Sequence, residues 1–87
     1  SNYRLEQNYP NPFNPATVIK FSVPEASKVT LKIYNSVGAE VMTVADKDYA
    51  AGNYIENVSM DGFSTGVYFY TLTAGNFKET KKMMLVK

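Results

Sequence analysis

The chain has 87 residues, 45% of them apolar, with nine Lys or Arg against eight Asp or Glu and a net charge of +1. This length is enough for one domain with a single core and too short for two. The near-neutral charge gives no electrostatic reason to expect nucleic acid or an anionic membrane as the main partner. Cysteine and histidine are absent, which excludes a disulfide framework, a thiol nucleophile, a cysteine-rich zinc site and a histidine general base.

The ends of the sequence suggest one part of a longer protein. No apolar run approaches the ~20 residues that span a bilayer. The N-terminus has neither an initiator Met nor the basic and then apolar pattern of a signal peptide. We therefore expect residues 1–87 to be a single domain of a longer chain.

Strand patterns dominate the first half of the chain. Residues 16–23 (ATVIKFSV) and 28–34 (KVTLKIY) alternate apolar and polar side chains, as strands with one buried face do. Pro24 ends the first run because proline cannot donate a hydrogen bond to a ladder. The link between the two runs is short, so we expect them to pair as an antiparallel hairpin.

Further strand patterns follow, separated by turns. A turn at 35–38 (NSVG) precedes a short strand, and residues 45–52 (ADKDYAAG) form a polar connection. We expect the remaining strands at 40–44, 54–60, 67–73 and 77–86, with a further edge strand at 5–9. About seven strands, regular turns and no capped helical period predict an all-β, antiparallel, immunoglobulin-like β-sandwich.

The last of these strands has an ambiguous pattern. Phe77, Met83 and Leu85 share one parity, whereas Met84 and Val86 have the other. Either the strand is buried on both faces near its end, or a bulge switches its register. The sequence leaves both alternatives open.

Residues 8–15 (NYPNPFNP) form the least regular segment. Its prolines fix φ and its asparagine side chains can bond nearby backbone groups. We therefore expect a rigid loop with Tyr9 and Phe13 available for packing. A loop that seals one end of the sandwich is favoured over a ligand-binding loop, because proline-locked turns are a common architectural device.

The strand at 67–73 (VYFYTLT) has the highest β-propensity in the chain. Tyr68, Tyr70 and Leu72 share one face of it. We expect Tyr68 and Leu72 in the core, with the Tyr68 hydroxyl bonded to backbone as in the tyrosine corner of this architecture. An exposed platform that stacks on sugars is the alternative, and the places of Phe69 and Tyr70 stay open.

The C-terminal stretch KETKKMMLVK combines lysines with an apolar run. Physical reasoning leaves two interpretations equal. The lysines can protect an edge strand against edge-to-edge pairing, or strand, cations and terminal carboxylate can be recognised together as an address. Such a strand is suited to meet another protein, including a second copy of the domain.

The chain offers little for catalysis or metal binding. Its acidic residues are scattered, and it has neither a glycine-rich phosphate loop nor a Ser-His-Asp set. Asp46 and Asp48 could contribute to a weak calcium site, but no loop supplies the six or more oxygens that calcium takes. We therefore expect no catalytic residue, no metal and no cofactor.

Taken together, these segments resemble the type A C-terminal sorting domain of cargo for the type IX (Por) secretion system of Bacteroidetes and related phyla. The resemblance runs over nearly the whole chain, from LEQNYPNPFNPATVIKFSVPEASKVTLKIYNSVGAEV through GVYFYTLTAGNF to KKMMLVK. The combination of these three segments is highly specific for the family, whereas any one segment alone would be a weak indication. Many relatives have Trp-Asp-Gly where this chain has MDG at 60–62, a departure that we expect to alter packing and not recognition.

The resemblance implies a seven-stranded sandwich at the end of a secreted or surface enzyme. The outer-membrane translocon would recognise the domain after export to the periplasm. In some members a sortase-like peptidase then removes the domain and can attach the cargo to lipopolysaccharide. The implied recognition residues are Gly66, Tyr68, Leu72, Lys82 and Lys87, and the implied structural-loop residues are Pro12, Asn14, Pro15 and Ile19.

Two other functions compete with a sorting signal. One is a carbohydrate-binding accessory module, which needs two or three coplanar exposed rings, for example from Tyr34, Tyr49, Tyr54 or Phe69. The other is a structural spacer or a self-associating module.

Overall fold

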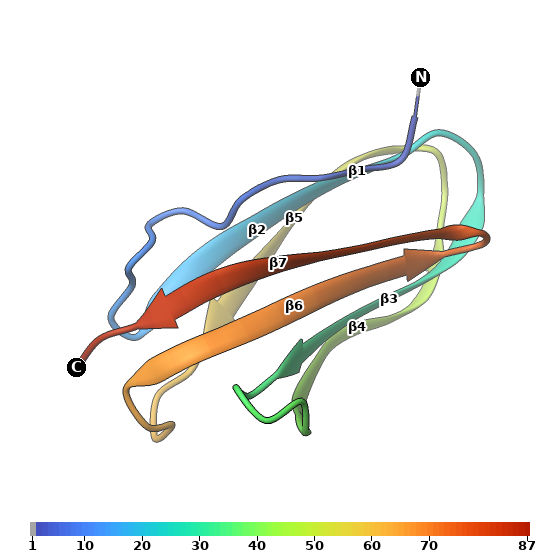
Figure 1. The fold of residues 1–87 in the computed structure, drawn as a ribbon. Helices are drawn as coiled ribbons and strands as arrows, with labels where there is room; N and C mark the ends of the chain where they lie inside the picture. Colours follow the sequence, from blue (N-terminus) through green and yellow to red (C-terminus); the bar gives the residue numbers. More distant parts are fainter. Residues whose placement is uncertain (1) are drawn as a thin grey trace.

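The protein is a two-layer β-sandwich. The computed structural model describes residues 2–87, which contain seven strands and no helix, and so no helix that could cross a membrane (Figure 1). One sheet has the order β1-β2-β5 and the other the order β4-β3-β6-β7. The predicted all-β sandwich is confirmed. The strands are β1 (Arg4–Leu5), β2 (Ala16–Val23), β3 (Ser27–Tyr34), β4 (Glu40–Tyr49), β5 (Gly52–Ser59), β6 (Gly66–Ala74) and β7 (Phe77–Leu85).

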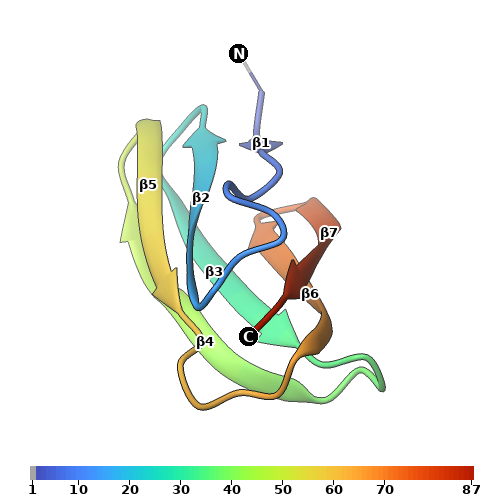
Figure 2. The same ribbon diagram turned by 90° about the vertical axis from the view of Figure 1, so that its left-hand side faces the viewer.

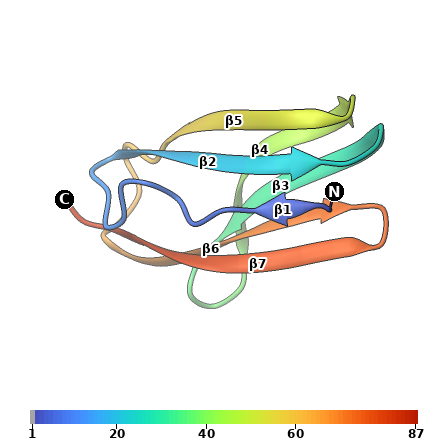
Figure 3. The same ribbon diagram turned by 90° about the horizontal axis from the view of Figure 1, so that it is seen from above.

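The connectivity is immunoglobulin-like. The first, second and fifth strands form one sheet, and the third, sixth and seventh lie in the other, as in immunoglobulin sandwiches. The fourth strand pairs with the third, whereas in constant-type domains it lies beside the fifth. Figures 2 and 3 show the two layers facing each other, with the N-terminal part of the chain between β2 and β7.

The predicted hairpin of residues 16–23 and 28–34 is wrong. β2 pairs with β1 and β5, and β3 pairs with β4 and β6, so the short link crosses from one sheet to the other. The buried faces of β2 and β3 therefore meet across the core. Apolar alternation reports which face of a strand is buried, but it does not report which strand is its neighbour.

The polar connection predicted at residues 45–52 is also wrong. β4 continues to Tyr49, and β5 begins at Gly52. Ala45 and Tyr49 are buried, while residues 46–48 between them are exposed. β4 lies at a sheet edge, and two register shifts interrupt its pairing with β3. Both shifts lie before Ala45, and from Ala45 to Tyr49 the pairing is regular. The strand was not visible there because Lys47 has the same parity as the buried Ala45 and Tyr49, which interrupts the apolar period.

The last strand follows neither predicted alternative. β7 pairs with β6 in one unbroken register from Phe77 opposite Ala74 to Leu85 opposite Gly66. Met83 and Leu85 are buried, whereas Met84 is 41% exposed. The strand therefore buries one face only, and no bulge occurs in it.

The core lies between the sheets and draws on both. Its largest fully buried side chains include Phe21 from β2, Leu31 from β3 and Tyr70 from β6. Phe13, which belongs to no strand, is also 2% exposed and is part of the same cluster. Within residues 2–87 every buried side-chain nitrogen or oxygen has a hydrogen-bond partner.

Candidate functional site

The candidate site is the C-terminal strand together with the chain segment that covers it. Residues 6–15, which we call the N-terminal segment, lie between β2 and β7 (Figure 3). The edge strand predicted at 5–9 is reduced to β1, because the chain beyond Leu5 turns toward β7. This segment contacts strands of both sheets.

The N-terminal segment bonds to the outer edge of β7. The Phe13 amide donates to the Met84 carbonyl (3.0 Å), and the Val86 amide donates to the Phe13 carbonyl (2.9 Å). The Asn11 side-chain oxygen accepts the Met84 amide (3.0 Å), and the Gln7 side-chain amide donates to the Lys82 carbonyl (2.8 Å). The edge of β7 opposite β6 is thus occupied from Lys82 to Val86.

The other side of the N-terminal segment bonds to β2. The Glu6 amide donates to the Lys20 carbonyl, and Tyr9 and Val18 exchange two backbone hydrogen bonds, all at 3.0 Å. Because β2 and β7 belong to different sheets, the segment ties the two layers together along this side of the sandwich.

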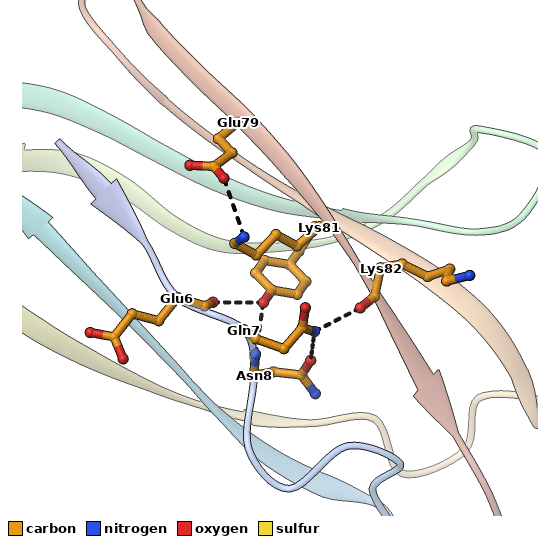
Figure 4. A network of polar contacts seen from close by, with 7 residues as sticks. Glu6, Gln7, Asn8, Glu79, Lys81 and Lys82 are labelled. Carbon is orange, nitrogen blue, oxygen red and sulfur yellow. Dashed lines mark hydrogen bonds and ion pairs between the residues drawn. The ribbon is translucent and has the colours of Figure 1, made fainter.

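Tyr70 of β6 anchors the middle of the N-terminal segment from within the core. Its hydroxyl accepts the Asn8 amide and donates to the Glu6 carbonyl, each at 2.7 Å (Figure 4). Burial raises the pKa of Tyr70 to about 12, and the negative charge of Glu79 acts in the same direction, while the bond from Asn8 opposes them.

Asn8 is a buried polar residue with all its partners in the protein. Its side-chain nitrogen donates to the Pro10 carbonyl (3.1 Å) and the Thr17 hydroxyl (3.0 Å). Its side-chain oxygen accepts from Gln7 (2.7 Å), the residue that also bonds to Lys82 (Figure 4). A buried polar group without such partners would destabilise the fold, so these bonds fix the path of the segment.

The residues predicted as a structural loop are divided between surface and interior. Pro12 and Asn14 are exposed, whereas Ile19 is fully buried in β2. The Pro15 carbonyl accepts the Met60 amide (2.9 Å), and the fully buried Met60 is part of the core. The loop closes one side of the sandwich. This agrees with the prediction of a sealing loop, but the loop covers the side between β2 and β7 and not only one end.

Of the five predicted recognition residues, three lie in strand β6. Gly66 opens β6, and Tyr68 and Leu72 point into the core with exposures of 7% and 0%. The Tyr68 hydroxyl donates to the Ser64 carbonyl (2.7 Å), which confirms the predicted tyrosine corner. In the ladder of β6 and β7, Gly66 pairs with Leu85 and Tyr68 pairs with Met83, whereas Leu72 pairs with Glu79.

The other two predicted recognition residues, Lys82 and Lys87, are exposed. Lys82 lies in β7, and the Lys87 amide donates to the Thr65 hydroxyl (3.2 Å), which holds the chain end against the loop before β6. We call residues 82–87 the tail. It is part of the sandwich, with Met83 and Leu85 buried between its exposed residues. Whether these lysines are recognised by a partner stays a prediction.

The sequence did not reveal the contacts that hold the tail. Gln7 and Asn11 bond to the tail through their side chains, and Phe13 bonds to it through its backbone. Asn8 and Tyr70 hold the segment that makes these bonds. One signal was present: Asn and Gln side chains carry donors and acceptors, and here they stand among prolines, which lack an amide hydrogen. Such a segment can still bond to another strand through its side chains.

Asp46 and Asp48, the two carboxylates considered as calcium ligands, lie on β4. Asp46 forms an ion pair with Lys28 (3.3 Å). Across the described residues 2–87, no group of three or more acidic side chains is placed to hold a metal ion.

Removing the Tyr70 hydroxyl should destabilise the fold. Tyr70→Phe leaves the Asn8 amide and the Glu6 carbonyl without their partner, which should lower the free energy of unfolding by about 1–3 kcal/mol. Tyr9→Phe is the control, because Tyr9 is 80% exposed. Urea unfolding of both variants checks this, and equal stability of the two would contradict the anchoring role.

The same residue predicts a loss of stability at high pH. Tyr70 stays neutral in the folded state up to about pH 12, whereas an unfolded tyrosine ionises near pH 10. Its contribution is therefore complete below pH ~10 and is lost as the pH rises toward ~12. Between pH 9 and 11 the parent should lose about 1 kcal/mol more than Tyr70→Phe in urea unfolding. Parallel losses would argue against the buried hydroxyl.

Comparison with known proteins identifies the family. A family model described as the secretion system C-terminal sorting domain matches residues 7–87, which is far more than half of the chain. Searches of curated proteins and of solved structures gave no match. The matched region includes nearly all of the N-terminal segment, the whole of β6 and the tail. The chain belongs to the family of C-terminal sorting domains of the type IX secretion system.

Proposed function

We propose that the tail is the part of this sorting domain that the export machinery reads. Domains of this family are sorting signals for type IX secretion, which carries proteins across the outer membrane to the cell surface or the extracellular space. The observation that carries the proposal is the placement of the tail, in which Lys82 and Lys87 are exposed while Met83 and Leu85 between them are buried in the core. A folded domain can therefore present the signal without unfolding.

The partners in this proposal are the outer-membrane translocon and a sortase-like peptidase. The translocon would bind the domain in the periplasm, and the peptidase would then remove it and attach the cargo to the surface. Residues 1–87 would be the sorting domain of a longer secreted protein whose catalysis lies elsewhere in that protein. The absence of His and Cys supports a role without catalysis for this part.

The arrangement of the aromatic rings weighs against carbohydrate binding. Tyr49 is 5% exposed, and its ring meets that of Tyr54 at 75°. Tyr54 in turn stacks on the buried Phe21. Tyr34 and Phe69 are neighbours on the outer face of the other sheet, but both are half-buried. Stacking on sugars needs coplanar exposed rings, and these four residues do not supply them.

The covered edge of β7 weighs against self-association through the tail. A second copy would need free backbone groups on that edge. From Lys82 to Val86 these groups bond to residues 7–13 of the same chain. The part of the edge near Lys78 has inward-pointing charges in the ion pair of Lys81 with Glu79 (3.2 Å), a feature that discourages strand pairing.

The proposal predicts that the tail lysines are needed for export. A secreted reporter fused to this domain should be retained in the cell when Lys82 and Lys87 are both changed to Ala. The folding of the variant should not change, because both side chains are exposed. Replacement of the exposed Lys28 and Lys47 by Ala is the matched control. Immunoblots of medium and cells give the exported fraction, and export equal to that of the parent fusion would refute the proposal.

A further inference from the structure

The backbone of the tail is not free to pair with a partner strand. On one side, Met83 and Leu85 pair with Tyr68 and Gly66 of β6. On the other side, the Lys82 and Met84 carbonyls and the Met84 and Val86 amides bond to the N-terminal segment. Strand addition needs an open edge. What the tail offers to another protein is therefore its side chains.

The outward side chains of the tail continue onto neighbouring strands. Because Met83 and Leu85 point inward, Lys82 and Met84 point to the outer face of the four-stranded sheet. Phe69 lies directly opposite Lys82, and Val67 lies directly opposite Met84. Cross-strand neighbours on one face have side chains in contact range. We call the set Tyr34, Val67, Phe69, Lys82 and Met84 the tail face, where Tyr34 lies opposite Phe69 on β3.

The tail face combines accessible apolar area with unpaired positive charge. Met84 is 41% exposed, and Tyr34, Val67 and Phe69 are half-buried. The ion pairs of the described chain use Lys28, Lys32 and Lys81. No carboxylate of residues 2–87 lies at ion-pair distance from Lys82 or Lys87. An apolar centre beside the unpaired Lys82 is complementary to an apolar protein surface flanked by a carboxylate.

We infer that the protein partner of this sorting signal binds the tail face, through the side chains of β3, β6 and β7, and does not add a strand to the edge of β7. The partner surface has an apolar centre that receives Met84 and Phe69, with an acidic side chain placed for Lys82. This inference rests on the proposed function, because it names the surface through which the tail is read.

A second exposed apolar region lies on the opposite side of the molecule. On the outer face of the three-stranded sheet, Ile55 is 61% exposed and Tyr9 is 80% exposed. The nearest basic partner in register is Lys20, opposite Ile55, and no tail residue belongs to this sheet. This face supplies a matched control, since a charge placed there alters an exposed apolar residue without changing the tail.

The test compares a charge on each face in the reporter fusion. Met84→Glu should reduce export to the level of a fusion without the domain, because it places a carboxylate against the acidic partner surface. Ile55→Glu and Met84→Leu should be exported like the parent, and thermal unfolding should show that all three domains are folded. The inference would be overturned if Met84→Glu were exported at the parent level, or if Ile55→Glu alone lost export.

A second pair of substitutions separates face from edge. Gln7→Ala with Asn11→Ala frees the Lys82 carbonyl and the Met84 amide on the edge of β7. If the partner binds the tail face, this double variant should be exported no faster than the parent. If the partner adds a strand to the edge of β7, the double variant should be exported faster, and that result would overturn the inference. If Met84→Glu is exported normally while the double lysine variant is retained, the tail face fails and the proposed function stands. If both are exported normally, the proposed function fails as well.

Discussion

The fold depends on the bonds between the N-terminal segment and the last strand. Four hydrogen bonds connect residues 7–13 to the outer edge of β7, and Phe13 fills the core beneath them. Tyr70 holds the same segment from inside through Asn8 and Glu6. A strand at a sheet edge ordinarily leaves a row of unpaired backbone groups. Here the N-terminal segment supplies hydrogen-bond partners for backbone groups of the tail. The shape of the tail therefore depends on a segment about 70 residues away.

This arrangement divides the family motif into two physical kinds of residue. Ile19, Tyr68 and Leu72 are buried in the core, and Tyr68 also pairs with Met83 of the tail. Lys82 and Lys87 are exposed and are available to a partner. Under the proposed function, a substitution in the first group would change export by destabilising the sandwich, whereas a substitution in the second group would change export with the fold intact. Stability measurements therefore have to accompany every export assay of this domain.

Much of the fold could be predicted from the sequence, because strands with one buried face have a visible period. Residues 16–23 coincide with β2, and the strands at 67–73 and 77–86 differ from β6 and β7 by a residue at their ends. The predicted hairpin was wrong because the apolar period of a strand does not show which strand pairs with it. The strand at residues 45–49 could not be predicted because its sequence at this sheet edge is mostly polar, with Lys47 between the two buried residues Ala45 and Tyr49.

The candidate site was predicted only in part, for a similar reason. The tail lysines and the Tyr68 corner could be read from local pattern. The bonds of Gln7, Asn8 and Asn11 join parts of the chain that are remote in sequence, and Asn8 to Tyr70 spans 62 residues. A polar residue gives no local sign of whether its partner is water, its own backbone or a distant strand. Only the three-dimensional structure answers that question.

Amide hydrogen exchange along β7 tests the central claim most directly. The amides of Lys78, Thr80, Met84 and Val86 all face the edge away from β6, by the alternation of an antiparallel ladder. Among the described residues, only those of Met84 and Val86 have partners from the N-terminal segment. After correction for intrinsic rates, these two should exchange about a hundredfold more slowly than Lys78 and Thr80, which corresponds to about 2.7 kcal/mol of local opening free energy. Equal protection of all four amides would contradict the account.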